Sequence, residues 1–119
     1  MRSKGRGSEQ AQAPLPASLI RRPAVDGPMR VRATALFHGR VQGVYFRANC
    51  QEKAESLGLD GYVRNLPSGG VEAVFEGERA LVEDCIEWNR SSQPAARVTS
   101  VDIVWGPATG EFRGFEIRR

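Results

Sequence analysis

Apolar residues recur with two different periods after Met29. Alternation of apolar and polar residues, which is typical of a strand with one buried face, occurs in five stretches. These stretches are residues 30–38, 59–65, 70–76, 98–105 and 112–118. Steps of three and four, which are typical of a helix with one buried stripe, occur at about residues 44–57 and 78–89. The pattern predicts the order strand, helix, strand, strand, helix, strand, followed by a short final strand.

Turn residues separate these elements. Gly58 follows the first helical stripe and is its expected C-terminal stop. Residues 67–70 combine proline, serine and two glycines, which predicts a hairpin between the second and third strands. The order of elements matches the split β-α-β plan of ferredoxin-like folds. We therefore predict an α+β fold, namely a ferredoxin-like α/β sandwich with an antiparallel sheet and two helices on one face.

This plan brings two loops together. A helical crossover joins the first and second strands, so these strands run parallel and end at the same edge of the sheet. The third strand lies between them, which places residues 39–47 and the turn near Asn65 about 10 Å apart. One site can therefore draw on both loops.

Residues 39–47 have the features of an anion site. Gly39 and Gly43 permit positive φ, and a glycine-containing turn that opens a helix presents unpaired N–H groups at the positive end of the helix dipole. Arg47, in the first helical turn, adds a guanidinium that matches two phosphate oxygens. An arginine that is merely exposed at a helix start explains this position equally well.

Asn65 ends the second strand, where an asparagine is commonly a turn former. Its amide also offers a donor and an acceptor without charge, which suits a water held in line with a bound phosphoryl group. Phosphoryl transfer depends mainly on positioning and electrostatics, so this chemistry needs no acidic or histidine base.

Two segments resemble the acylphosphatase family. They are GRVQGVYFR, at residues 39–47, and LGLDGYVRNLPSGGVE, at residues 57–72, and they match the two family signatures in the same order. The likeness continues through QPAARVTSV and GFEIRR and so covers residues 30–119. It implies hydrolysis of the carboxyl–phosphate bond of a small-molecule acyl phosphate to a carboxylate and inorganic phosphate, with no metal or other cofactor.

The resemblance also implies roles for individual residues. In the family, the arginine matching Arg47 binds phosphate together with loop N–H groups, and the asparagine matching Asn65 orients the attacking water. The implied catalytic residues are Arg47 and Asn65. The implied phosphate-binding residues are Arg40, Val41, Gln42, Gly43, Val44 and Arg47. Ser68 stands where the family commonly has an aspartate, at a turn position that is not catalytic.

The net charge of the chain lies in its first 28 residues. The 119 residues include 17 Lys and Arg against 14 Asp and Glu. Five of those basic and two of those acidic residues lie in residues 1–28, which leaves 12 of each in residues 29–119. Residues 1–28 also contain four of the seven prolines and no aromatic residue. We predict a disordered extension over residues 1–28 and an acylphosphatase-like domain over residues 29–119, with Met1 and Met29 both open as the translation start.

The main alternative is a non-catalytic ferredoxin-like module that binds an anion or RNA. The neutral domain and the mixed charges of its outward residues argue against RNA, so we expect no nucleic-acid partner. A second alternative is an acylphosphatase-like domain of a larger carbamoyl-transferring maturation protein. A salt-dependent gel shift, compared with an acyl-phosphate hydrolysis assay, separates a nucleic-acid-binding module from an enzyme.

Other residue types point to a small cytoplasmic enzyme. His38 is the single histidine, and no cluster has the spacing of metal ligands. Cys50 and Cys85 are expected to be free thiols, because the chain has no export signal. No apolar stretch reaches the length of a membrane span. We therefore expect a cytoplasmic monomer that neither binds a metal nor contacts a membrane.

Overall fold

Five strands and two helices follow one another in the predicted order. The computed structural model describes residues 29–119, and the predicted extension over residues 1–28 lies outside the described residues. The elements are β1 (Arg30–Arg40), α1 (Phe46–Ser56), β2 (Asp60–Asn65), β3 (Val71–Glu78), α2 (Arg79–Ser91), β4 (Arg97–Pro107) and β5 (Phe115–Arg118). The last strand begins at Phe115, later than the alternation from residue 112 predicts, because the preceding residues belong to the connection that leaves β4.

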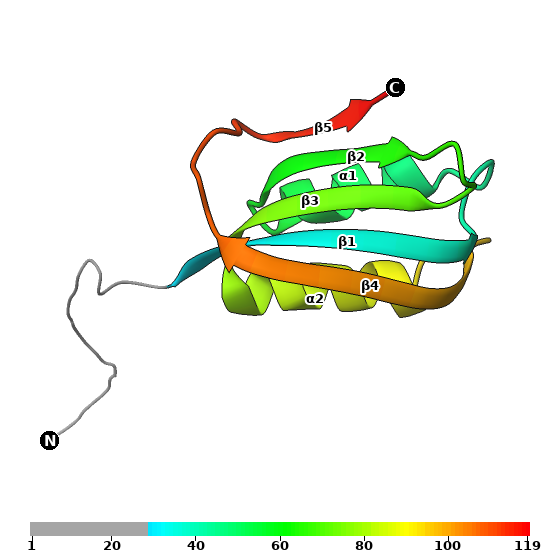
Figure 1. Cartoon of the computed structure of the whole chain (residues 1–119), viewed down its shortest axis with the longest axis horizontal. Helices are drawn as coiled ribbons and strands as arrows, with labels where there is room; N and C mark the ends of the chain where they lie inside the picture. Colours follow the sequence, from blue (N-terminus) through cyan, green and yellow to red (C-terminus); the bar gives the residue numbers. More distant parts are fainter. Residues whose placement is uncertain (1–28) are drawn as a thin grey trace, which may run out of the picture.

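The strands form one sheet in the order β4-β1-β3-β2-β5 (Figure 1). β3 lies between β1 and β2 and is antiparallel to both, so β1 and β2 run parallel, as predicted. β4 is antiparallel to β1, whereas β5 is parallel to β2. The sheet is therefore antiparallel over four strands and mixed at its β5 edge. β4 ends at the end of the sheet where β2 begins. The segment that leaves β4 therefore reaches the outer edge of β2 at its start, and β5 runs in the same direction as β2.

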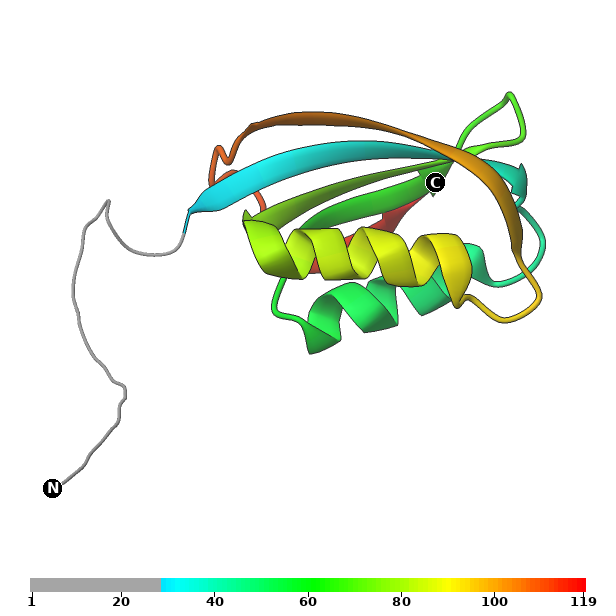
Figure 2. The same ribbon diagram turned by 90° about the horizontal axis from the view of Figure 1, so that it is seen from below.

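Both helices cover one face of the sheet, which confirms the predicted sandwich (Figure 2). Neither helix of the described residues is long and apolar enough to cross a membrane. The fully buried core residues include Ala33, Ala35, Phe37, Phe46, Cys50, Ala54, Val63, Ala73, Phe75, Val82 and Cys85. The rings of Phe37 and Phe46 lie 5.1 Å apart between centroids, which holds the start of α1 against the end of β1. Cys50 and Cys85 are free, as predicted, and both are buried.

The connection between β4 and β5 covers part of the opposite face. Glu76 points to this face, as the alternation predicts, but its exposure is only 1%. Its carboxylate accepts hydrogen bonds from the N–H groups of Thr109, at 2.9 Å, and Gly110, at 3.0 Å, and pairs with the Arg32 Nε at 2.8 Å. Burial acts to raise the pKa of Glu76, but these hydrogen bonds outweigh it and lower the pKa to about 2.

Candidate active site

The loop between β1 and α1 contains two residues with a left-handed backbone. Gly43 has a φ of 76° and Tyr45 a φ of 62°, both left-handed, and residues in such a turn direct neighbouring N–H groups into one concavity. Within residues 29–119, no oxygen accepts a hydrogen bond from the backbone N–H groups of residues 42–47. α1 also begins without a side-chain cap and without an acidic residue in its first turn. These N–H groups are therefore available to an anion.

The left-handed backbone of Tyr45 was not predicted from the sequence. A tyrosine rarely adopts this conformation, which costs on the order of 1 to 3 kcal/mol. The side chain is 82% exposed and lies at the cavity wall, so the strain is not repaid by burial of its ring. The strained backbone of Tyr45 belongs to the turn whose N–H groups are available to an anion.

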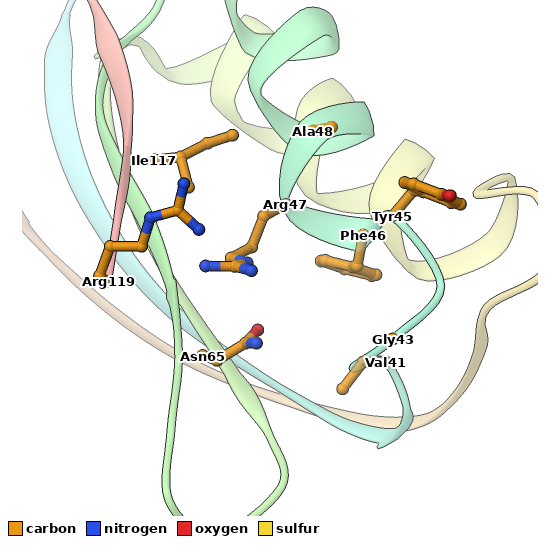
Figure 3. A pocket seen from close by; sticks show the side chains of 9 residues that line it. All are labelled: Val41, Gly43, Tyr45, Phe46, Arg47, Ala48, Asn65, Ile117 and Arg119. Atoms are coloured by element: carbon orange, nitrogen blue, oxygen red, sulfur yellow. The ribbon is translucent and has the colours of Figure 1, made fainter.

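Arg47 is the second residue of α1, and its side chain points into the cavity beside this loop (Figure 3). Its Nη1 lies 3.5 Å from the carbonyl oxygen of Arg118. Among the residues that the structure describes, no carboxylate pairs with its guanidinium. A cation at the positive end of a helix dipole is unfavourable without a counter-charge, so this arrangement favours a bound anion.

Asn65 is the last residue of β2 and faces the same cavity from the sheet (Figure 3). Its side-chain amide and the Arg47 guanidinium point toward one another across the cavity. The structure thus brings together the two residues that the sequence predicted to converge.

The side chain of Gln42 ties the loop to the turn that follows Asn65. Its Nε2 donates hydrogen bonds to the carbonyl oxygens of Leu66 and Gly70, each at 2.8 Å. The Leu66 N–H also donates to the Gly70 carbonyl, at 2.9 Å, which closes the turn. The family resemblance implied a role only for the backbone N–H of Gln42. The topology placed the two loops near each other, but no sequence signal indicated which side chain joins them.

The cavity has a volume of about 400 Å³, within the range of small-molecule sites. Its lining residues are Val41, Gly43, Tyr45, Phe46, Arg47, Ala48, Asn65, Ile117 and Arg119. Four predicted site residues are among them, whereas Arg40, Gln42 and Val44 are not. Arg40 lies opposite Arg97 of β4, and Val44 packs against the core. The roles predicted for these three concern their backbone groups and stay predictions.

Other reactive side chains lie away from the cavity. The His38 Nε2 lies 2.9 Å from the Asp102 carboxylate on the open face of the sheet. Burial raises the pKa of the Cys50 thiol well above its usual range and that of Cys85 to about 12, so neither is a ready nucleophile. In residues 29–119, no three His, Cys, Asp or Glu residues gather as metal ligands.

Most of the described residues match one known protein family. The acylphosphatase family model matches residues 33–117. The chain belongs to the acylphosphatase family. This membership confirms the resemblance predicted from residues 39–47 and 57–72.

Individual acylphosphatases match most of the domain. The acylphosphatase of Rubrobacter xylanophilus is 51% identical over 87 residues, which are 73% of this chain and 79% of that protein. The acylphosphatase of Aeropyrum pernix is 55% identical over 89 residues, or 74% of this chain and 88% of that protein. The crystal structure of the acylphosphatase from Bacillus subtilis superposes with a TM-score of 0.72 at 28% identity, covering 75% of this chain and 99% of that one.

Proposed function

We propose that this protein hydrolyses the carboxyl–phosphate bond of acyl phosphates and releases a carboxylate and inorganic phosphate. The observation that carries the proposal is that the Arg47 guanidinium and the Asn65 amide face one cavity, beside the uncapped start of α1. The chain belongs to the acylphosphatase family, and a relative that is 51% identical bears this name, which supports the same reaction.

The phosphoryl group binds where the loop and Arg47 meet. Its oxygens accept hydrogen bonds from loop N–H groups within residues 40–44 and from the Arg47 guanidinium, whose planar fork suits two oxygens at once. Donors of this kind are already oriented before the reaction begins. Each is worth roughly 2.7 to 4 kcal/mol when it stabilises charge in the transition state.

Asn65 holds the attacking water opposite the leaving group. The water oxygen forms a new bond to phosphorus while the bond from phosphorus to the carboxyl oxygen breaks, and that oxygen leaves with the electron pair as a carboxylate. One proton of the water passes to a phosphoryl oxygen of the substrate. The carboxylate is a good leaving group, so it needs little help from an acid.

Steady-state hydrolysis of benzoyl phosphate by the full-length chain tests this function. We expect turnover that is unchanged by a chelator and is inhibited competitively by inorganic phosphate. Loss of activity with the chelator would contradict the metal-free mechanism. Binding of inorganic phosphate without any hydrolysis would favour the anion-binding module instead.

A further inference from the structure

A second guanidinium, that of Arg119, lines the cavity beside Arg47 (Figure 3). Arg119 follows β5, and the parallel pairing of β5 with β2 sets Ile117 opposite Val63 and Arg118 opposite Arg64. Because β2 ends at Asn65, this pairing carries Arg119 to the edge of the sheet that holds the site. Among residues 29–119, no carboxylate pairs with the Arg119 guanidinium.

The neighbouring arginine is engaged elsewhere. The Arg118 guanidinium lies 4.0 Å from the ring centroid of Tyr62, and its Nε donates to the Glu116 carboxylate at 2.8 Å. Successive residues of a strand point to opposite faces, so Arg118 covers the open face while Arg119 turns to the cavity. The two terminal arginines of GFEIRR therefore have different surroundings, and of the two only Arg119 lines the cavity beside Arg47.

The cavity is larger than the phosphoryl site alone. The loop and Arg47 bound one part of it, and Ile117 and Arg119 bound another, on the far side of Arg47 (Figure 3). The cavity thus has room for a substrate with its phosphoryl group at the loop and its acyl chain along Ile117, directed at the Arg119 guanidinium.

We propose that Arg119 binds a negatively charged end of the acyl group, so that the preferred substrates are acyl phosphates whose acyl chain carries a carboxylate. This inference rests on the proposed hydrolysis and adds a substrate class to it. Two cations without carboxylate partners in one cavity repel each other, and a substrate with two anionic ends neutralises both. A carboxylate also matches the planar guanidinium with two parallel hydrogen bonds.

The test compares two substrates of equal chain length with the full-length protein. Succinyl phosphate ends in a carboxylate, and butyryl phosphate ends in a methyl group. We expect the wild-type protein to have the higher kcat/KM for succinyl phosphate. Arg119→Gln should lower that kcat/KM about tenfold, as for loss of a hydrogen bond to a charged group, and change butyryl phosphate less than about twofold. Arg119→Lys should restore part of the preference.

Arg113→Gln is the matched control, because it removes the same charge from the β4–β5 connection, at the end of the sheet remote from the β1–α1 loop (Figure 1). We expect it to leave both substrates unchanged. An equal loss on both substrates with Arg119→Gln, or no loss on either, would overturn the role in acyl recognition. Wild-type hydrolysis of both substrates without preference would overturn that role alone, whereas hydrolysis of neither would overturn the proposed function itself.

Discussion

At the scale of single residues, the site combines one charged and one neutral side chain. Arg47 lacks a carboxylate partner among residues 29–119 and points into the cavity. In the proposed mechanism it binds the phosphoryl group, which is charged before, during and after the reaction. In the same mechanism Asn65 holds the attacking water, which matters only for the chemical step. Mutations at the two positions should therefore separate binding from turnover.

Arg47→Gln is expected to weaken both binding and turnover. The variant loses the charge and the planar fork that are proposed to hold phosphate oxygens, so kcat/KM for benzoyl phosphate should fall by about 100-fold. The inhibition constant of inorganic phosphate should rise in parallel. Unchanged inhibition by phosphate would remove Arg47 from the phosphate site.

Asn65→Ala is expected to lower kcat by about 100-fold while the inhibition constant of phosphate changes less than about threefold. The variant loses the amide that is proposed to orient the water, but it keeps the proposed phosphoryl donors of the loop and Arg47. The same assay measures both quantities. An Asn65→Ala protein with wild-type turnover would contradict the water-positioning role.

At the scale of elements, the fold places α1 so that Arg47 meets Asn65. Gln93, which is 7% exposed, donates from its Nε2 to the Phe46 carbonyl at 2.9 Å and to the Asn89 side-chain oxygen at 2.8 Å. Asn89 is fully buried and donates in turn to the Cys85 carbonyl at 2.8 Å. Gln93, which follows α2 and is held by Asn89 of that helix, thereby fixes the first residue of α1. Gln42 performs the corresponding task between the loop and the hairpin turn.

Gln42→Ala is expected to lower kcat about tenfold with a small loss of stability. The variant loses two hydrogen bonds that set the loop against the turn after Asn65, and small misplacements of reacting groups are costly. The matched control is Gln51→Ala. Gln51 lies in α1, and its side chain likewise donates a hydrogen bond to a backbone carbonyl, that of Phe115, at 3.0 Å. Steady-state kinetics and thermal unfolding of both variants compare the effects. Equal kinetic losses in the two variants would contradict a specific positioning role for Gln42.

Local sequence signals predict the positions of Arg47 and Asn65. Both residues lie at the ends of elements whose periodicity is clear, and the crossover rule brings those ends together. Local signals do not predict contacts that depend on the packing of distant segments. The alternation placed Glu76 on the outward face but gave no sign that residues 108–114 cover it. It likewise gave no sign that Arg119 of the parallel edge strand reaches the cavity.

At the scale of the whole molecule, the carboxylate of Glu76 joins the middle of the sheet to the connection that spans it. The folded pKa of about 2 lies below the ordinary value of 4.5. A depressed pKa adds stability that is complete above the ordinary value and is lost as the pH falls toward the folded value. The shift corresponds to about 3 kcal/mol at neutral pH.

Acidification is therefore expected to destabilise the protein between about pH 4.5 and 2, and Glu76→Gln to reduce that dependence. The variant should also have a lower free energy of unfolding at pH 7. Urea unfolding at several pH values measures both effects. Glu83→Gln is the control, because within residues 29–119 Glu83 forms only an exposed pair with Arg79 and such pairs add little. The same pH slope in Glu76→Gln and wild type would exclude Glu76 as its source.

The position of β1 inside the sheet bears on how the chain folds. Arg32 lies opposite Glu76 on one side and Gly106 on the other, so neither neighbour of this strand is close to it in sequence. Long loops must close before these strands can pair, and their entropy is lost before the contacts form. We expect folding to be slower than that of a helical bundle of equal length. Residues 29–78, which precede α2, leave one edge of β1 unpaired until β4 docks. We therefore expect the loop after β1 to become rigid only when β4 has docked.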